Sequence, residues 1–311
     1  MLAKLPQALL YWSGVAAEEG RGACILSLHG TPRRRSAELA RQLAYLKRAF
    51  HVVPLSEIVQ RFELGSPVDG LVALTFDDGL RNQVEVAYPL LERYELPATF
   101  FLCPQLIDER AWLWTHEARL RFSFLEPEES RSLARRLGAP AGLEPFVDWM
   151  KRLKHPSRVA VERTLRVMTP YFAADWRDRE DCDLASWEEL RRMSRALVSF
   201  GSHTLTHPML RSLRLDRLQE ELRDSRRLLE ERLGRAAEFF AYPDGEHHAA
   251  AREFVRAYYR AAFVCARQRV EPGIDPCLLP RMAVPRGVLR LALMMNARLD
   301  RAPSPPVLQP A

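Results

Sequence analysis

The 311-residue sequence lacks an apolar run long enough to cross a membrane as a helix. The nearest candidate is the uncharged stretch at residues 5–17, which lies between Lys4 and Glu18. It is too short to span a bilayer, and Pro6 and Gln7 interrupt what would be the core of a signal peptide. We therefore expect a short amphipathic N-terminal helix in a cytoplasmic protein, with peripheral attachment to a membrane as the alternative.

Cysteine is also scarce, and the pattern of the cysteines argues against a disulfide framework or a redox motif. There are five of them, an odd number, and none belongs to a C-x-x-C pair. Three lie in or beside short apolar runs that are typical of strands, so the sequence predicts buried, reduced thiols. The cysteines are Cys24, Cys103, Cys182, Cys265 and Cys277.

Signatures of nucleic-acid-binding modules are missing, since the chain contains neither a zinc finger nor an RNA-binding motif. The formal net charge of +6 and the three consecutive arginines at residues 33–35 could still attract an acidic polymer. A solvated arginine-rich surface explains the same charge, so we expect no nucleic-acid partner. Steeply salt-dependent binding to DNA or RNA would distinguish the alternative.

What the sequence does contain is an alternation of short apolar runs with longer charged segments of helical spacing. Such alternation is typical of an α/β fold with a mostly parallel sheet. We expect a single domain over residues 1–311, built as a (β/α) barrel of seven or eight strands that is distorted or incomplete. The predicted strands lie at residues 23–28, 51–55, 71–76, 98–102, 196–200, 237–242, 261–266 and 278–284.

The helices expected between these strands include one from Leu215 to Leu233, which has a leucine stripe on one face and Gly234 as its C-terminal cap. Residues 105–185 break the alternation, because this stretch is charged and helical in composition throughout. We interpret it as a helical insertion within the barrel. The proline-rich residues 302–311 are expected to form a disordered tail.

Polar residues gather where the predicted strands end, which is the edge that carries the active site in parallel α/β folds. A single Asp-Gly pair after a strand is usually only a turn, and two nearby histidines can be surface residues. Here five strand ends carry an imidazole, a carboxylate or a guanidinium, and this coincidence indicates an active site. The residues are His29, Asp77, Asp78, His203, His207, Asp244 and Arg281.

The chemistry of this set fits a metal site. Two imidazoles and one carboxylate, with coordination positions left open, form a known catalytic arrangement for Zn²⁺ and also for Fe²⁺. His203 and His207 would supply the imidazoles, and either Asp77 or Asp78 the carboxylate. The cation would relieve the repulsion between the two adjacent carboxylates. The aspartate that remains free could then act as a general base on water.

Several motifs occur in a characteristic order: TFDDG at residues 75–79, LPATFFL at 96–102, SHTLTH at 202–207, FFAYPDG at 239–245 and PRMAV at 280–284. In this order they resemble the motifs of the polysaccharide deacetylase superfamily, carbohydrate esterase family four. The resemblance covers roughly residues 20–104 and 186–290. It implies an enzyme that removes acetyl groups from N-acetylated sugars, or O-acetyl groups in some members.

The resemblance also implies a role for each motif residue. Asp77 would be the catalytic base, and Asp78 would bind the metal together with His203 and His207. The metal would be a divalent cation, with zinc preferred over iron, cobalt or nickel. Backbone N–H groups of the third motif would help hold an oxyanion, and the residues concerned are Tyr242, Pro243 and Asp244.

The sequence departs from the family pattern at two places. Ala241 and Asp244 stand where the third motif usually has an arginine and an aromatic residue, and Arg281 is expected to supply the missing guanidinium that orients the base. The family's late histidine, the general acid, is also absent, because no histidine follows His248. His29 is expected to replace it, as in a permuted branch that resembles the poly-N-acetylglucosamine deacetylases, although a capping or core role is the alternative.

The leading hypothesis is therefore a metal-dependent hydrolase that deacetylates an N-acetylated sugar in a glycan or glycan precursor. The departures in the third motif leave open a non-catalytic carbohydrate-binding relative, and an O-acetyl esterase is the other alternative. The insertion carries four of the six tryptophans, which could stack on sugar rings or fill a small helical core. His247 and His248 are expected to begin a helix and are left out of the site.

Overall fold

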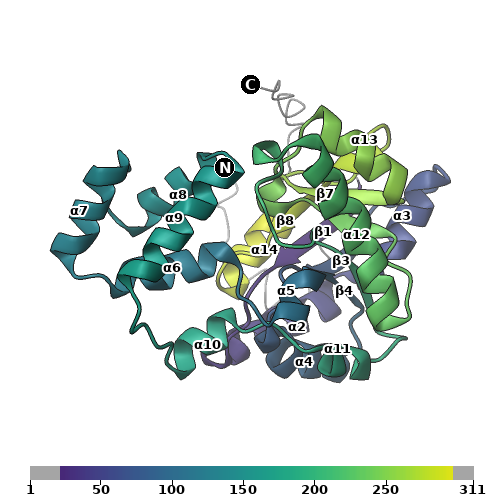
Figure 1. Cartoon of the computed structure of the whole chain (residues 1–311). Helices are drawn as coiled ribbons and strands as arrows, with labels where there is room; N and C mark the ends of the chain where they lie inside the picture. Colours follow the sequence, from purple (N-terminus) through teal and green to yellow (C-terminus); the bar gives the residue numbers. More distant parts are fainter. Residues whose placement is uncertain (1–21, 297–311) are drawn as a thin grey trace, which may run out of the picture.

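The computed structural model describes residues 22–296, and its strands form one parallel sheet that closes on itself (Figure 1). The strand β1 pairs with both β8 and β3, so seven strands make a closed barrel while β2 stays beside β3. The predicted α/β barrel is thus confirmed. The strands are β1 (Cys24–Leu28), β2 (His51–Val52), β3 (Leu71–Phe76), β4 (Ala98–Leu102), β5 (Val198–Ser202), β6 (Phe239–Ala241), β7 (Ala261–Cys265) and β8 (Leu279–Ala283).

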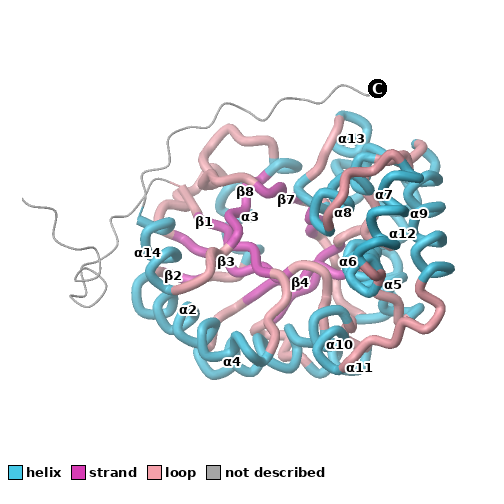
Figure 2. Tube along the Cα trace, turned by 90° about the vertical axis from the view of Figure 1, so that its left-hand side faces the viewer, coloured by secondary structure: helices cyan, strands magenta, loops and turns pink. Residues whose placement is uncertain are grey.

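The helices surround the strands, as Figure 2 shows. The barrel is flanked by η1 (Arg33–Arg35), α2 (Ser36–Ala49), α3 (Leu55–Glu63), η2 (Gln83–Ala87), α4 (Tyr88–Tyr94), η3 (Leu210–Ser212), α12 (Leu215–Leu233), η4 (Pro243–Gly245), α13 (Ala249–Tyr258), η5 (Pro276–Leu278) and α14 (Val288–Asn296). Between β4 and β5 lie α5 (Pro104–Glu109), α6 (Trp114–Phe124), α7 (Pro127–Leu137), α8 (Leu143–Arg152), α9 (His155–Met168), α10 (Trp176–Cys182) and α11 (Trp187–Arg192). Within residues 22–296, no helix combines the length and the hydropathy needed to cross a bilayer.

Strand alternation divides the barrel residues into an inner and an outer set. The inner set packs inside the barrel and includes Ile25, Ala73 and Phe101. The outer set, with Leu74 on β3, packs against the surrounding helices. Since every second residue faces inward, the stripe that begins at Leu71 on β3 continues through Ala73 toward the polar residues at the end of that strand.

The helices α6–α9 extend to one side of the barrel and have a small core of their own (Figure 1). Trp114 belongs to this core and is only 5% exposed, whereas Trp176 on α10 is 67% exposed. Packing in this core therefore explains the presence of Trp114 but not that of Trp176. Met209, from the loop after β5, joins the same core and ties these helices to the barrel.

Some details differ from the sequence-based expectations. The strand expected at 51–55 ends at Val52, because Pro54 has no N–H to donate and α3 begins at Leu55. All five cysteines are free, as expected, and four are buried, but Cys265 is exposed at the end of β7. The N-terminal helix expected near residues 5–17 and the tail at 302–311 lie outside the described residues.

Candidate functional site

The end of β3 positions the two adjacent aspartates. The backbone N–H of Asp77 donates to the carbonyl of Leu28 at 2.9 Å, which continues the pairing with β1 by one residue. The chain then turns sharply, since Asp78 has a φ of 80° and Gly79 a φ of 74°. A Cβ atom on Gly79 would lie 2.8 Å from Cδ2 of Leu102, so this turn requires glycine. The two carboxylates are thereby held in different environments.

Asp77 forms a bidentate ion pair with Arg281 of β8, inside the barrel. The Nη1–Oδ1 distance is 2.6 Å and the Nη2–Oδ2 distance is 2.8 Å, and Nη1 also donates to Oγ1 of Thr75 at 3.0 Å. The side chains of Arg281 and Asp77 are 0% and 2% exposed. The guanidinium lies 5.0 Å from the ring centroid of Phe101, which forms the floor beneath it.

This environment keeps Asp77 ionised. Burial acts to raise the pKa of Asp77, but the positive charge of Arg281 outweighs it and, with smaller effects of His203 and His29, holds the pKa below its ordinary value. An ionised carboxylate at this point can accept a proton or a hydrogen bond.

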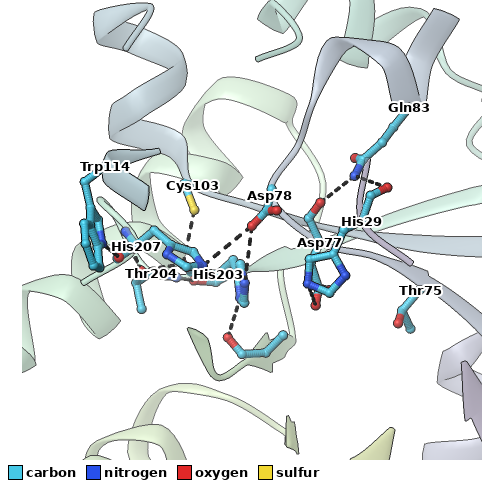
Figure 3. Close-up of polar contacts among 12 residues, drawn as sticks. His29, Thr75, Asp77, Asp78, Gln83, Cys103, Trp114, His203, Thr204 and His207 are labelled. Atoms are coloured by element: carbon cyan, nitrogen blue, oxygen red, sulfur yellow. Dashed lines mark hydrogen bonds and ion pairs between the residues drawn. The ribbon is translucent and has the colours of Figure 1, made fainter. Parts of the chain in front are cut away.

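Asp78 lies against two histidines from the loop that follows β5. Its Oδ1 is 3.7 Å from Nε2 of His203 and 3.6 Å from Nε2 of His207, and dashed lines in Figure 3 join Asp78 to both rings. These separations are too long for hydrogen bonds. Two ligands at tetrahedral positions on one zinc ion would be about 3.3 Å apart. The three donor atoms, all within 4.8 Å of one another, therefore fit around a small cation.

The surroundings of the two rings suit the same role. Nδ1 of His203 donates to the carbonyl of Ala241 at 2.7 Å, which leaves the Nε2 lone pair available to a metal. Burial, together with the charge of His203, lowers the pKa of His207 to about 4, so this ring is neutral at pH 7. A buried set of two imidazoles and one carboxylate matches the donors that divalent zinc or iron takes.

The loop that carries the two histidines is held in a constrained conformation. Thr204 and His207 have φ values of 71° and 55°. Oγ1 of Thr204 accepts the N–H of His207 at 2.9 Å, and Sγ of Cys103 donates to the carbonyl of His203 at 3.3 Å. Six non-glycine residues among residues 22–296 have a positive φ, and four of them lie at this site: Asp78, Thr204, His207 and Asp244. Backbone strain of this kind clusters at functional sites.

His29 reaches the site from the end of β1. Its Nε2 is 3.8 Å from Oδ2 of Asp77, and Figure 3 shows its ring beside that aspartate. Its side chain is 54% exposed, so it contacts both the buried carboxylate and solvent. The side-chain amide of Gln83 donates to the backbone carbonyls of both Asp77 and His29. Gln83 begins the π-helical turn η2, a rare conformation that is frequent at functional sites.

The turn after β6 has fewer free backbone N–H donors for an oxyanion than the sequence suggested. The N–H of Tyr242 is already donated to the carbonyl of Phe263 at 3.0 Å, and its ring packs in a buried cluster behind the strand. Pro243 has no N–H at all. Of the three residues predicted to hold an oxyanion, only Asp244 has a backbone donor left to offer. Its carboxylate pairs with Nζ of Lys151 from α8 at 2.8 Å.

Two residues of the helical segment approach the site, and neither was expected there from the sequence. Nε1 of Trp114 donates to the carbonyl of His207 at 2.9 Å and so fixes the loop from outside the barrel. His116 lines the same cavity as His29 and Asp78, and its buried Nδ1 has no hydrogen-bond partner among the described residues. Burial lowers the pKa of His116 below its ordinary value. Neither residue belongs to a recognisable motif, so only the fold brings them here.

Comparisons with known proteins point to one family. A family model described as polysaccharide deacetylase matches residues 65–261 of the chain. No curated protein sequence matches it.

Solved structures share the fold at low sequence identity. The deacetylase PplD of Streptococcus pyogenes, solved in complex with acetate, is 16% identical with a TM-score of 0.59, and the match covers 89% of this chain and 99% of that one. IcaB from Ammonifex degensii is 21% identical with a TM-score of 0.60, covering 90% and 99%. The BpsB deacetylase domain from Bordetella bronchiseptica is 16% identical with a TM-score of 0.55, covering 85% and 96%.

Proposed function

The chain belongs to the polysaccharide deacetylase family, and from this premise we propose that it hydrolyses the acetamide of an N-acetylated sugar in a glycan or glycan precursor, releasing acetate. We propose further that the reaction depends on a divalent metal. The observation that carries the proposal is the difference between the surroundings of the two adjacent aspartates. Asp77 is held ionised by Arg281, while Asp78 faces two histidine nitrogens at metal-ligand separations.

Asp78, His203 and His207 would hold the cation. The chemistry that such an ion would supply there is Lewis-acid polarisation of the acetamide carbonyl and a lower pKa of a nearby water. Hydrogen bonds that orient these ligands favour the assignment. The carbonyl of Ala241 orients the ring of His203, and the indole N–H of Trp114 fixes the backbone of His207. Zinc is the preferred ion for this donor set, with iron, cobalt and nickel as alternatives.

Asp77 would act as the general base. Its carboxylate takes the proton of the attacking water, and Arg281 keeps both oxygens in place through two hydrogen bonds. The N–H of Asp244 would donate to the carbonyl oxygen of the acetyl group as negative charge develops there. Its left-handed backbone, with a φ of 53°, turns this peptide unit away from regular strand geometry.

His29 would act as the general acid. Its Nε2 lies 3.8 Å from Asp77 at the open side of the site, where a sugar nitrogen could approach. Donation of a proton to that nitrogen allows the carbon–nitrogen bond to break and leaves acetate and a free amine. Acetate is also the ligand in the PplD structure, which belongs to a deacetylase of the same fold.

Acetate release tests the proposal. The protein is stripped of metal, reloaded with zinc, iron, cobalt or nickel, and assayed against N-acetylated saccharides, their O-acetylated counterparts and lipid-linked precursors. We expect acetate from at least one N-acetylated substrate and none from the metal-free protein. A metal-loaded protein that binds saccharides but releases no acetate would instead indicate a carbohydrate-binding relative, and release from O-acetyl substrates alone would indicate an esterase.

Substitutions separate the assigned roles. His203→Ala and Asp78→Ala are expected to lose the metal, and normal metal content in either variant would show that the ligand set is wrong. His29→Ala is expected to keep the metal and lower kcat, with partial recovery on addition of imidazole. His247→Ala serves as the matched control, because this ring packs against Tyr242 behind the strand and should leave kcat unchanged.

A further inference from the structure

The cavity that contains the proposed site is bordered by arginines that the proposed function does not use. It has a volume of about 530 Å³, and the charged and titratable side chains that line it are Asp78, His29, His116, Arg34, Arg35, Arg286, Glu38 and Asp181. A neutral sugar needs no guanidinium groups for binding. Their presence beside the proposed site therefore needs a separate explanation.

Two of the three consecutive arginines hold the helical segment against the barrel. Arg33 donates through Nη2 to Glu85 at 2.9 Å and through its backbone N–H to Glu180 at 2.6 Å. Arg34 pairs with Asp181 of α10 at 2.7 Å. Their charges are compensated by carboxylates of the chain itself. This structural role explains part of the arginine cluster without a ligand.

Arg35 and Arg286 differ, because they share a single carboxylate. Arg35 contacts Glu38 at 3.3 Å, and Oε1 of Glu38 also accepts the N–H of Gly287 at 2.6 Å. Hydrogen bonds from Arg35 and Gly287 hold the pKa of Glu38 below its ordinary value, so this carboxylate carries one negative charge against two positive ones. Arg286 is exposed, and its charge also contributes to the lowered pKa of Glu38, although no ion pair at close range joins it to a described residue. One positive charge is left uncompensated at the cavity wall.

The fold places these two arginines next to the proposed general acid. Arg35 follows β1, which ends just before His29, and Arg286 follows β8, the neighbour of β1 in the barrel. Both arginines, with His29 and Gly30, also line an adjoining cavity of about 240 Å³. The two cavities therefore share the wall formed by His29, Gly30 and the two arginines, and the first of them also reaches Asp78.

We propose that Arg35 and Arg286 form a subsite for an oxyanion, so that the substrate is an N-acetylated sugar carrying a phosphate or a carboxylate close to the acetamide. The inference rests on the proposed function and narrows its substrate class. Guanidinium groups suit both anions, because their N–H donors bind two oxygens at once. Neither arginine contacts the reacting atoms, so the subsite acts on substrate binding and positioning.

Matched substrates and two independent readouts test this inference. The probes are N-acetylglucosamine, its 1-phosphate and N-acetylmuramic acid, which present no anion, a phosphate and a carboxylate. Binding to the zinc-loaded protein is measured by calorimetry, and acetate release is measured in parallel. We expect one of the two anionic sugars to bind at least about tenfold more tightly than the neutral sugar, which corresponds to about 1.4 kcal/mol. The sugar that binds more tightly shows whether the subsite prefers a phosphate or a carboxylate.

Three variants and one control connect the preference to the proposed residues. Arg286→Ala and Arg35→Ala are each expected to reduce the anionic preference about tenfold, through KM rather than kcat. Glu38→Gln should increase it, because it removes the competing carboxylate while keeping an acceptor for Gly287. The control is Arg163→Ala, an exposed arginine on α9, which should leave the preference unchanged. Raising the salt concentration should weaken the preference in the wild type.

The outcomes distinguish this inference from the proposed function. Acetate release with equal affinity for neutral and anionic sugars, or a preference that survives Arg286→Ala, would overturn the subsite and leave the deacetylase proposal intact. Arginine-dependent binding of an anionic sugar, without acetate release from it or from any substrate of the wider panel, would support the subsite and refute the deacetylase. Because Arg286 is exposed, its variant should fold normally, and the test holds even if Arg35→Ala proves unstable.

Discussion

The buried pair of Asp77 and Arg281 allows a quantitative prediction about stability. Removal of Arg281 deletes two hydrogen bonds to Asp77, at 2.6 and 2.8 Å, and one to Thr75 at 3.0 Å. It also leaves a carboxylate that is 2% exposed without a countercharge. Removing one partner of such a pair costs about 3–5 kcal/mol, a large share of the 5–15 kcal/mol that stabilises a typical protein. We therefore expect Arg281→Leu to lower the free energy of unfolding by about 3–5 kcal/mol.

The double variant gives the sharper test. Asp77→Leu should also be strongly destabilising, because it strands the guanidinium inside the barrel. Replacing both partners by leucine removes both charges at once, and such replacements are often close to neutral. The double variant is thus expected to be more stable than either single variant, with a coupling energy of several kcal/mol. Arg192→Leu is the control, since Arg192 and Glu188 are 73% and 72% exposed and their pair should contribute less than about 1 kcal/mol.

Urea unfolding followed by circular dichroism measures these free energies. The proteins are first freed of metal with a chelator, because an ion that binds only the folded state would add stability of its own. Additive effects of the two single substitutions, or a loss below about 1 kcal/mol for Arg281→Leu, would refute the reasoning. Either result would mean that the pair is hydrated in solution and that Asp77 is not held in place as described.

Three further predictions concern the metal centre and its turn. Trp114→Phe removes the N–H donated to the carbonyl of His207 and should weaken zinc binding at least about tenfold in a chelator competition. Gly79→Ala forces a Cβ to within 2.8 Å of Leu102 at a φ of 74°, and should lower the free energy of unfolding by about 1–3 kcal/mol in urea. Zinc at about 100 times its Kd should stabilise the wild type by about 2.7 kcal/mol and His203→Ala not at all, in the same urea assay. The first prediction is contradicted if Trp114→Phe binds zinc as tightly as the wild type, and the second if Gly79→Ala is as stable as the wild type. The third is contradicted if zinc stabilises His203→Ala as much as the wild type.

Much of the fold could be predicted from the sequence because parallel strands bring their ends together. The apolar runs identified the strands, and the polar residues after them were expected to meet at one edge. The structure brings Asp77, Asp78 and the two motif histidines together there, and it places Arg281, which was expected to orient the base, within hydrogen-bond distance of Asp77. The order of the strands along the chain did not reveal that β1 pairs with both β8 and β3. This pairing closes a barrel of seven strands and leaves β2 outside it.

Contacts between distant segments explain most of what the sequence could not show. Trp114 and His207 are separated by 93 positions, and no local periodicity relates them. The position of His116 beside the site depends on how a helical segment docks on the barrel, partly through pairs such as Arg34 with Asp181. The error at Pro243 is of another kind, because the lack of an N–H in proline was visible in the sequence itself.

The most direct test of the central claim is the behaviour of Asp77→Asn, with metal content and acetate release measured on the same samples. If Asp78, His203 and His207 bind the cation while Asp77 works as the base, this variant keeps about one metal per chain and loses nearly all turnover. Loss of the metal would place Asp77 among the ligands. Full metal content with acetate release close to that of the wild type would contradict the account.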